Sequence, residues 1–118
     1  DLLMFYNISA EFAYSLDKRS VAERSKSVVF SSIPDAILVS GQITGESVAI
    51  SELQKVKNLI PHTPVLANTG VKIENVEDTL SVADGVIIGS SLKEDGNTWN
   101  AVDPKRASDF MNKVKSIR

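Results

Sequence analysis

Residues 83–93, Ala-Asp-Gly-Val-Ile-Ile-Gly-Ser-Ser-Leu-Lys, decide the fold. Gly85–Ile88 is an apolar, largely β-branched run that is short enough for a buried parallel strand. Gly89 and Ser90 follow where this strand ends; glycine allows a close backbone approach there, and a serine hydroxyl can donate to an anion. Because ligands bind at the carboxyl ends of strands in open α/β sheets and in barrels, the stretch predicts a strand that ends at a ligand site.

A second strand of this kind lies upstream, at Pro64–Ala67, and it runs into Asn68-Thr69-Gly70-Val71. Many eight-stranded βα barrels hold a phosphate on the two loops that follow their last two strands. We therefore predict a phosphate site in which Gly70, Val71, Gly89 and Ser90 offer backbone N–H groups. The alternative is that both glycines only turn the chain.

The rest of the chain repeats the alternation of strand and helix. Strands are predicted over 2–8, 35–39, 64–67 and 85–88, and helices over 20–33, 51–60, 73–80 and 103–118. Capping boxes are predicted at Ser20–Glu23 and Ser51–Gln54, and Asp103-Pro104 is a typical helix start. Pro34 and Pro61 end the first two helices, because proline cannot continue a helix.

Four βα units form a parallel sheet, but a closed barrel needs about eight strands. We expect a single domain over residues 1–118, a (βα)4 half of a TIM-type barrel that self-association completes, giving a homodimer. The alternative is an open, flavodoxin-like sheet with helices on both faces. The chain begins at Asp1 and not at Met, which we interpret as a truncated gene, a trimmed chain or a missing upstream half.

Composition excludes several classes of function. The 118 residues carry a net charge of −2, which gives no electrostatic reason to bind nucleic acid. No apolar run reaches the roughly 18 residues of a membrane span. Without cysteine and with His62 as the sole histidine, we expect no metal site and no cofactor, and the composition fits a reducing cytoplasm.

Several segments resemble one protein family, the BtpA/SgcQ family, and in particular its C-terminal half. They are VSGQITG at 39–45, PVLANTGV at 64–71, ENV at 74–76, ADGVIIG at 83–89, SLKEDG at 91–96 and VDP at 102–104. The resemblance implies a TIM-type barrel, of which this chain would supply strands 5 to 8, and a family named for a role in photosystem I biogenesis. It supplies no catalytic residues. The family pattern also leads us to expect an acidic residue and a Lys-His pair near Asn7, Glu11 and Phe12, where this chain departs from it.

Two further groups of residues are candidates for the site. A ligand-binding loop is predicted from Ser40, Gly41, Thr44 and Gly45, with Asn68 and Thr69 at the next strand end; the alternative is ordinary turn formation. For catalysis the candidates are Glu11, Lys93 and Asp95, since a lysine can neutralise a ligand charge and a carboxylate can act as a base. A solvated charged loop is the competing interpretation of Lys93 and Asp95.

Three hypotheses for function remain open. The first is a barrel half that binds a phosphorylated small molecule such as a sugar phosphate. The second is a non-catalytic assembly or accessory factor, as the family name implies. The third is a gene fragment that folds by self-association and has no activity of its own.

Overall fold

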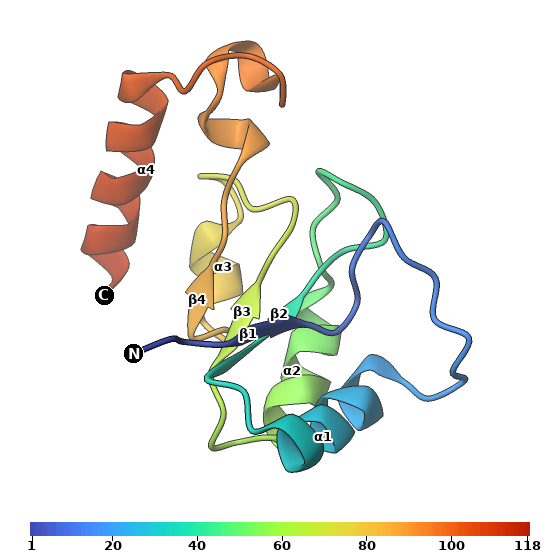
Figure 1. The fold of residues 1–118 in the computed structure, drawn as a ribbon. Helices are drawn as coiled ribbons and strands as arrows, with labels where there is room; N and C mark the ends of the chain where they lie inside the picture. The colour runs from blue at the N-terminus through green and yellow to red at the C-terminus, as the bar shows by residue number, and fades with distance from the viewer.

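A four-stranded parallel sheet, described by a computed structural model of residues 1–118, organises the chain (Figure 1). The strands lie side by side in the order in which they occur in the sequence. They are β1 (Phe5–Asn7), β2 (Ala36–Val39), β3 (Val65–Ala67) and β4 (Gly85–Val86). Residues Ile37 and Val65 are partners in the register of β2 and β3, and the predicted parallel α/β architecture is confirmed.

Helices connect the strands. They are α1 (Val21–Ser32), α2 (Ile50–Leu59), α3 (Val76–Leu80) and α4 (Pro104–Ile117), with short 3₁₀ helices at η1 (Ser90–Leu92) and η2 (Glu94–Gly96). Ser20 and Glu23 form the predicted capping box, and Asp103 accepts hydrogen bonds from two backbone N–H groups of α4. The capping box predicted at Ser51 is wrong, because α2 already begins at Ile50 and Ser51 lies inside the helix.

Side chains alternate between the two faces of the sheet, and only one face is covered by helices. Ile37, Val39, Val65 and Ala67 are fully buried in one core cluster, together with residues of all four helices. The helical members of this cluster are Ala22, Leu53, Val56, Val76 and Phe110. A doubly wound, flavodoxin-like sheet carries helices on both faces, so the structure has the half-barrel arrangement instead.

Helix α4 completes the covered side. Phe110 inserts into the core cluster, and Lys113 forms an ion pair with Glu77 of α3. At the end of the chain, the Arg118 guanidinium donates to the carbonyl oxygen of Asp84 at 2.8 Å. None of the helices has the length and apolar character needed to span a lipid bilayer.

Candidate functional site

The carboxyl ends of the strands surround a cavity of about 250 Å³. Most of the residues predicted for the site line it, namely Glu11, Thr44, Gly45, Asn68, Thr69, Gly70, Val71, Gly89, Ser90 and Lys93. Four lining residues escaped the sequence prediction, namely Lys72, Ile87, Ser91 and Thr98. The fold therefore brings the two predicted glycine loops, the loop after β2 and Glu11 to one place.

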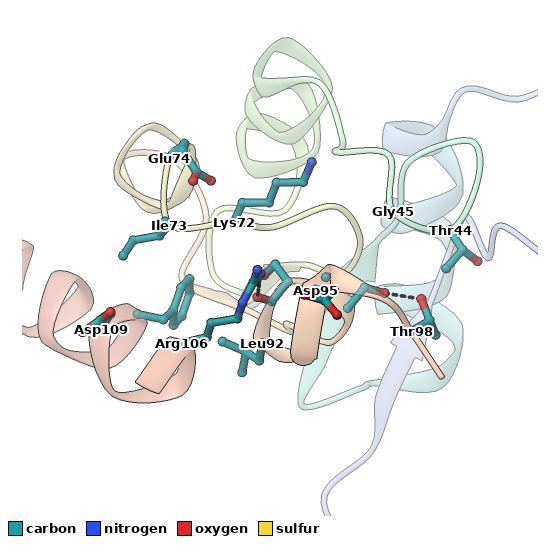
Figure 2. A pocket seen from close by; sticks show the side chains of 14 residues that line it. Thr44, Gly45, Lys72, Ile73, Glu74, Leu92, Asp95, Thr98, Arg106 and Asp109 are labelled. Atoms are coloured by element: carbon teal, nitrogen blue, oxygen red, sulfur yellow. Dashed lines mark hydrogen bonds between the residues drawn. The ribbon is translucent and has the colours of Figure 1, made fainter. Parts of the chain in front are cut away.

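A larger cavity of about 690 Å³ adjoins the first and shares several of its lining residues, including Lys72, Ser90 and Ser91. Figure 2 shows Lys72, Ile73 and Glu74 entering it from the loop after β3, and Arg106 and Asp109 entering it from α4. Asp95, a predicted catalytic candidate, lies here and not in the smaller cavity. Arg106 was not among the predicted site residues, because the sequence shows it only as a residue in the first turn of a helix.

Unpaired backbone donors distinguish the smaller cavity. The N–H groups of Gly70, Val71, Gly89, Ser90 and Ser91 donate no hydrogen bond to any other part of the chain. Gly89 is exposed and Gly70, Ser90 and Ser91 are half-buried, so these N–H groups are accessible to a ligand. Clusters of such groups at loop turns form anion sites. This set of donors belongs to the two loops from which the sequence predicted a phosphate site.

The two predicted glycines have different surroundings. Gly70 has φ +64°, and a Cβ atom there would lie 2.2 Å from the backbone nitrogen of Ser47. Gly89 has no heavy atom within 4 Å of the place where its Cβ would lie. Close packing of the chain thus explains Gly70, whereas the space beside Gly89 is open to the cavity.

The loop after β2 is tied to its neighbours by side-chain hydrogen bonds. Thr69 Oγ1 accepts a hydrogen bond from the Gly41 N–H at 2.6 Å and donates to the Glu46 carbonyl oxygen at 2.8 Å. Asn68 Nδ2 donates to Ser40 Oγ at 2.9 Å, and Ser40 Oγ donates to Asn7 Oδ1 at 3.2 Å. Ser40 and Gly41 do not line either cavity, so the structure places them in the support of the site.

A further hydrogen bond connects the two glycine loops to each other. The Ser91 hydroxyl donates to the Val71 carbonyl oxygen at 2.9 Å, and the Ser90 and Thr98 hydroxyls lie 2.6 Å apart. The Ser91–Val71 bond fixes the separation of the loops after β3 and β4, and the Ser90–Thr98 contact lies within the second of these loops. The free N–H groups are thereby held in place before any ligand arrives, which reduces the entropy lost on binding.

The charged candidates lie at different depths. Glu11 Oε1 accepts a hydrogen bond from Thr44 Oγ1 at 3.5 Å, while Glu11 Oε2 is buried without a partner. Lys93 lines the smaller cavity, and no ion pair involves it or Lys72. Asp95 has φ +55°, a left-handed conformation that aspartate tolerates better than most residues. No group of three or more His, Cys, Asp or Glu side chains is placed to hold a metal ion.

Another ionic contact lies at the opposite, amino-terminal end of the strands. Asp84 Oδ2 accepts hydrogen bonds from the Val65 N–H at 2.7 Å and from Lys57 Nζ at 2.8 Å. Burial raises the pKa of Asp84, but these hydrogen bonds and the charges of Lys57 and Arg118 outweigh it and hold the pKa below its usual value. Asp84 therefore stabilises the start of β3 and β4 and takes no part in the cavity.

Comparison with known proteins identifies the family. The sequence model of the BtpA family matches residues 1–116. The chain belongs to the BtpA family. It is 46% identical to the sgc region protein SgcQ of Escherichia coli (strain K12) over 113 aligned residues, and this alignment covers 96% of the chain and 42% of SgcQ. It is 29% identical to the photosystem I biogenesis protein BtpA of Synechocystis over 111 aligned residues, and this alignment covers 94% of the chain and 39% of that protein.

Solved structures of TIM-barrel proteins share the fold of this BtpA-family chain. GGGPS from Thermoplasma volcanium aligns with a TM-score of 0.63 at 20% identity, over 87% of this chain and 40% of its own. The N-(5'-phosphoribosyl)anthranilate isomerase of Pyrococcus furiosus aligns with a TM-score of 0.62 at 20% identity, over 95% of this chain and 49% of its own. The chain thus spans less than half the length of these relatives and neighbours.

Proposed function

We propose that this BtpA-family chain binds the phosphate group of a phosphorylated small molecule at the carboxyl ends of β3 and β4. The observation that carries the proposal is the set of unpaired N–H groups at Gly70, Val71, Gly89 and Ser90 around one cavity. Hydrogen bonds from such groups to an anionic oxygen are charge-assisted and about twice as strong as neutral ones. Lys72, at the same cavity, supplies a positive charge that no carboxylate of the chain neutralises.

The open space beside Gly89 supports this interpretation. Within the chain, no packing contact requires a glycine at this position. A ligand oxygen that approaches the Gly89 and Ser90 N–H groups would occupy the volume that a Cβ atom fills. The start of η1 at Ser90 also resembles the short extra helix at which many TIM barrels bind phosphate.

The size and polarity of the two cavities favour a sugar phosphate. The smaller cavity accommodates the phosphate, and the adjoining 690 Å³ cavity offers room for a polar organic part. Polar and charged groups dominate its lining, with only Ile73, Leu92 and Phe110 as hydrophobic members. One structural neighbour, the N-(5'-phosphoribosyl)anthranilate isomerase, is itself named for a phosphorylated sugar compound.

Glu11, Lys93 and Asp95 are the side chains that we propose for any proton transfer to this ligand. Glu11 and Lys93 share the cavity that holds the N–H groups, whereas Asp95 lies in the adjoining one. The accessory-factor hypothesis, based on the relative named for photosystem I biogenesis, is the weaker one. It gives no reason for a cavity lined by free N–H donors.

Calorimetric titration with ribose 5-phosphate, and with ribose as the matched control, tests the proposed function. We expect binding of the phosphorylated sugar and none of ribose. Lys72→Met is expected to weaken the binding about tenfold, because it removes one charge-assisted contact and keeps the aliphatic stem. Lys55→Met, on the exposed side of α2, is the control and leaves affinity unchanged. Equal affinity for both sugars, or no binding of either sugar or of inorganic phosphate, would contradict the proposal.

A further inference from the structure

Glu11 is the single acidic residue among those that line the smaller cavity. Its Oε1 accepts a hydrogen bond from Thr44 Oγ1 at 3.5 Å, whereas its Oε2 is buried and has no hydrogen-bond partner. Lys72 and Lys93 line the same cavity, but neither forms an ion pair with Glu11. A buried carboxylate oxygen without a donor is costly, so this atom indicates a donor that the chain itself does not supply.

The loop that carries Glu11 is fixed to the end of the neighbouring strand. Ser9 Oγ accepts a hydrogen bond from the Ser40 N–H at 2.9 Å and donates to the Ser40 carbonyl oxygen at 3.3 Å. The Ala13 N–H donates to the Ala10 carbonyl oxygen at 3.1 Å, which closes a turn around Glu11. The loop is thus held in place without a ligand, and little entropy is lost when Glu11 gains a partner.

The phosphate group of a ligand is not the missing partner of Glu11. A phosphate dianion, like a carboxylate, only accepts hydrogen bonds, and the two negative charges repel each other. The phosphate instead has the free N–H groups of Gly70 and Gly89 and the ammonium group of Lys72. The donor to Glu11 therefore belongs to the organic part of the ligand, and in a sugar phosphate that donor is a hydroxyl group. Because one cavity of about 250 Å³ holds Glu11 and the N–H groups, this hydroxyl lies on a carbon close to the phosphate.

We propose that Glu11 determines specificity at this site: it selects phosphate esters with a hydroxyl group close to the phosphate over esters without one and over free phosphate. The inference rests on the phosphate site proposed at Gly70 and Gly89. Glu11 Oε2 accepts the hydrogen bond of the ligand hydroxyl, while Oε1 keeps its bond from Thr44. An ester without the hydroxyl leaves Oε2 unpaired, and sites built to bind a hydroxyl discriminate strongly against analogues that lack it.

Calorimetric titration with two phosphate esters tests this role. Ribose 5-phosphate and cyclopentylmethyl phosphate share the phosphate and a five-membered ring, but the second ester has no hydroxyl group. We expect the parent chain to bind ribose 5-phosphate at least about tenfold more tightly. Glu11→Met is expected to weaken the binding of ribose 5-phosphate about tenfold, because the acceptor is lost. The same variant is expected to tighten the binding of inorganic phosphate at least about twofold, because the repelling charge is gone.

Glu46→Met is the matched control for the loss of one negative charge near the site. The Glu46 side chain is exposed and lines neither cavity, so this variant is expected to keep the preference for ribose 5-phosphate. Circular dichroism of both variants checks that they fold. Should Glu11→Met not fold, the comparison of the two esters on the parent chain decides alone.

The outcomes separate the role of Glu11 from the phosphate site itself. Equal affinity of the parent chain for the two esters would overturn selection by Glu11. A Glu11→Met variant that binds both esters and inorganic phosphate more weakly by the same factor would also overturn it, since Glu11 would then only support its loop. Both results leave the phosphate site standing. If the parent chain binds neither ester nor inorganic phosphate, the phosphate site fails, and the role of Glu11 fails with it.

Discussion

Gly70 and Gly89 follow neighbouring parallel strands and line the same cavity, yet different forces account for them. Gly70 has a left-handed backbone and packs against the chain between Glu46 and Ser47, so the fold itself demands glycine there. Gly89 has a negative φ of −133° and an empty space beside it. One glycine therefore builds the wall of the site, and the other leaves room for an occupant.

The largest expected effect comes from Gly70→Ala. The new Cβ would collide with the Ser47 backbone at 2.2 Å and would hold alanine at φ +64°. We expect a loss of at least about 3 kcal/mol in the free energy of unfolding. Urea denaturation followed by circular dichroism measures this loss. A variant that is as stable as the parent would contradict the close contact between Gly70 and the backbone of the loop after β2.

The next largest effect is expected from Thr69→Val, which tests whether this wall depends on hydrogen bonds. The change removes both hydrogen bonds of Thr69 Oγ1 and leaves the Gly41 N–H without its acceptor. We expect a loss of about 2 kcal/mol in stability, again by urea denaturation. Thr63→Val, in the turn before β3, is the control because no hydrogen bond within the chain involves the Thr63 hydroxyl, and it should cost much less. Equal losses would contradict the support role of Thr69.

The smallest effect is expected at the other end of β4, where Asp84 has all its partners within the chain. Because its folded pKa is lowered, Asp84 contributes stability above its unfolded pKa of 3.8, and this contribution is lost as pH falls through the folded pKa. Its side chain is 44% exposed, so solvent screening keeps the contribution small. Comparing the stabilities of the parent chain and Asp84→Asn at about pH 6 and about pH 3 measures it. The account predicts that the parent and Asp84→Asn differ less in their free energy of unfolding at the lower pH. A difference that stays the same at both pH values would contradict this role.

Local sequence signals were sufficient to predict the four strands and the starts of two helices, α1 and α4. Ser20 and Asp103 cap their helices through contacts within three residues, which the sequence displays directly. The start of α2 was misplaced because Ser51-Glu52-Leu53-Gln54 has capping-box spacing, whereas the helix begins at Ile50 with Ala49 as its N-cap and no capping side chain. Capping-box spacing alone therefore does not fix a helix start.

The candidate site was predictable in its backbone and less so in its side chains. The strand-glycine pattern located Gly70 and Gly89, and Lys72 could have been added because it follows Gly70 by two residues in the same loop. The roles of Ser40 and Thr69 could not be foreseen, because they depend on loops that the fold brings together from 28 residues apart. The uncovered sheet face likewise became visible only when the alternation of each strand was set against the positions of the helices.

Gly89→Ala, measured for both stability and binding of ribose 5-phosphate, tests the central claim most directly. A Cβ at this position meets no atom of the chain, so we expect the free energy of unfolding to change by less than about 0.5 kcal/mol. We expect binding to fall at least about tenfold, since the methyl group takes the place of a phosphate oxygen. Unchanged stability together with unchanged affinity would contradict a phosphate site at the end of β4.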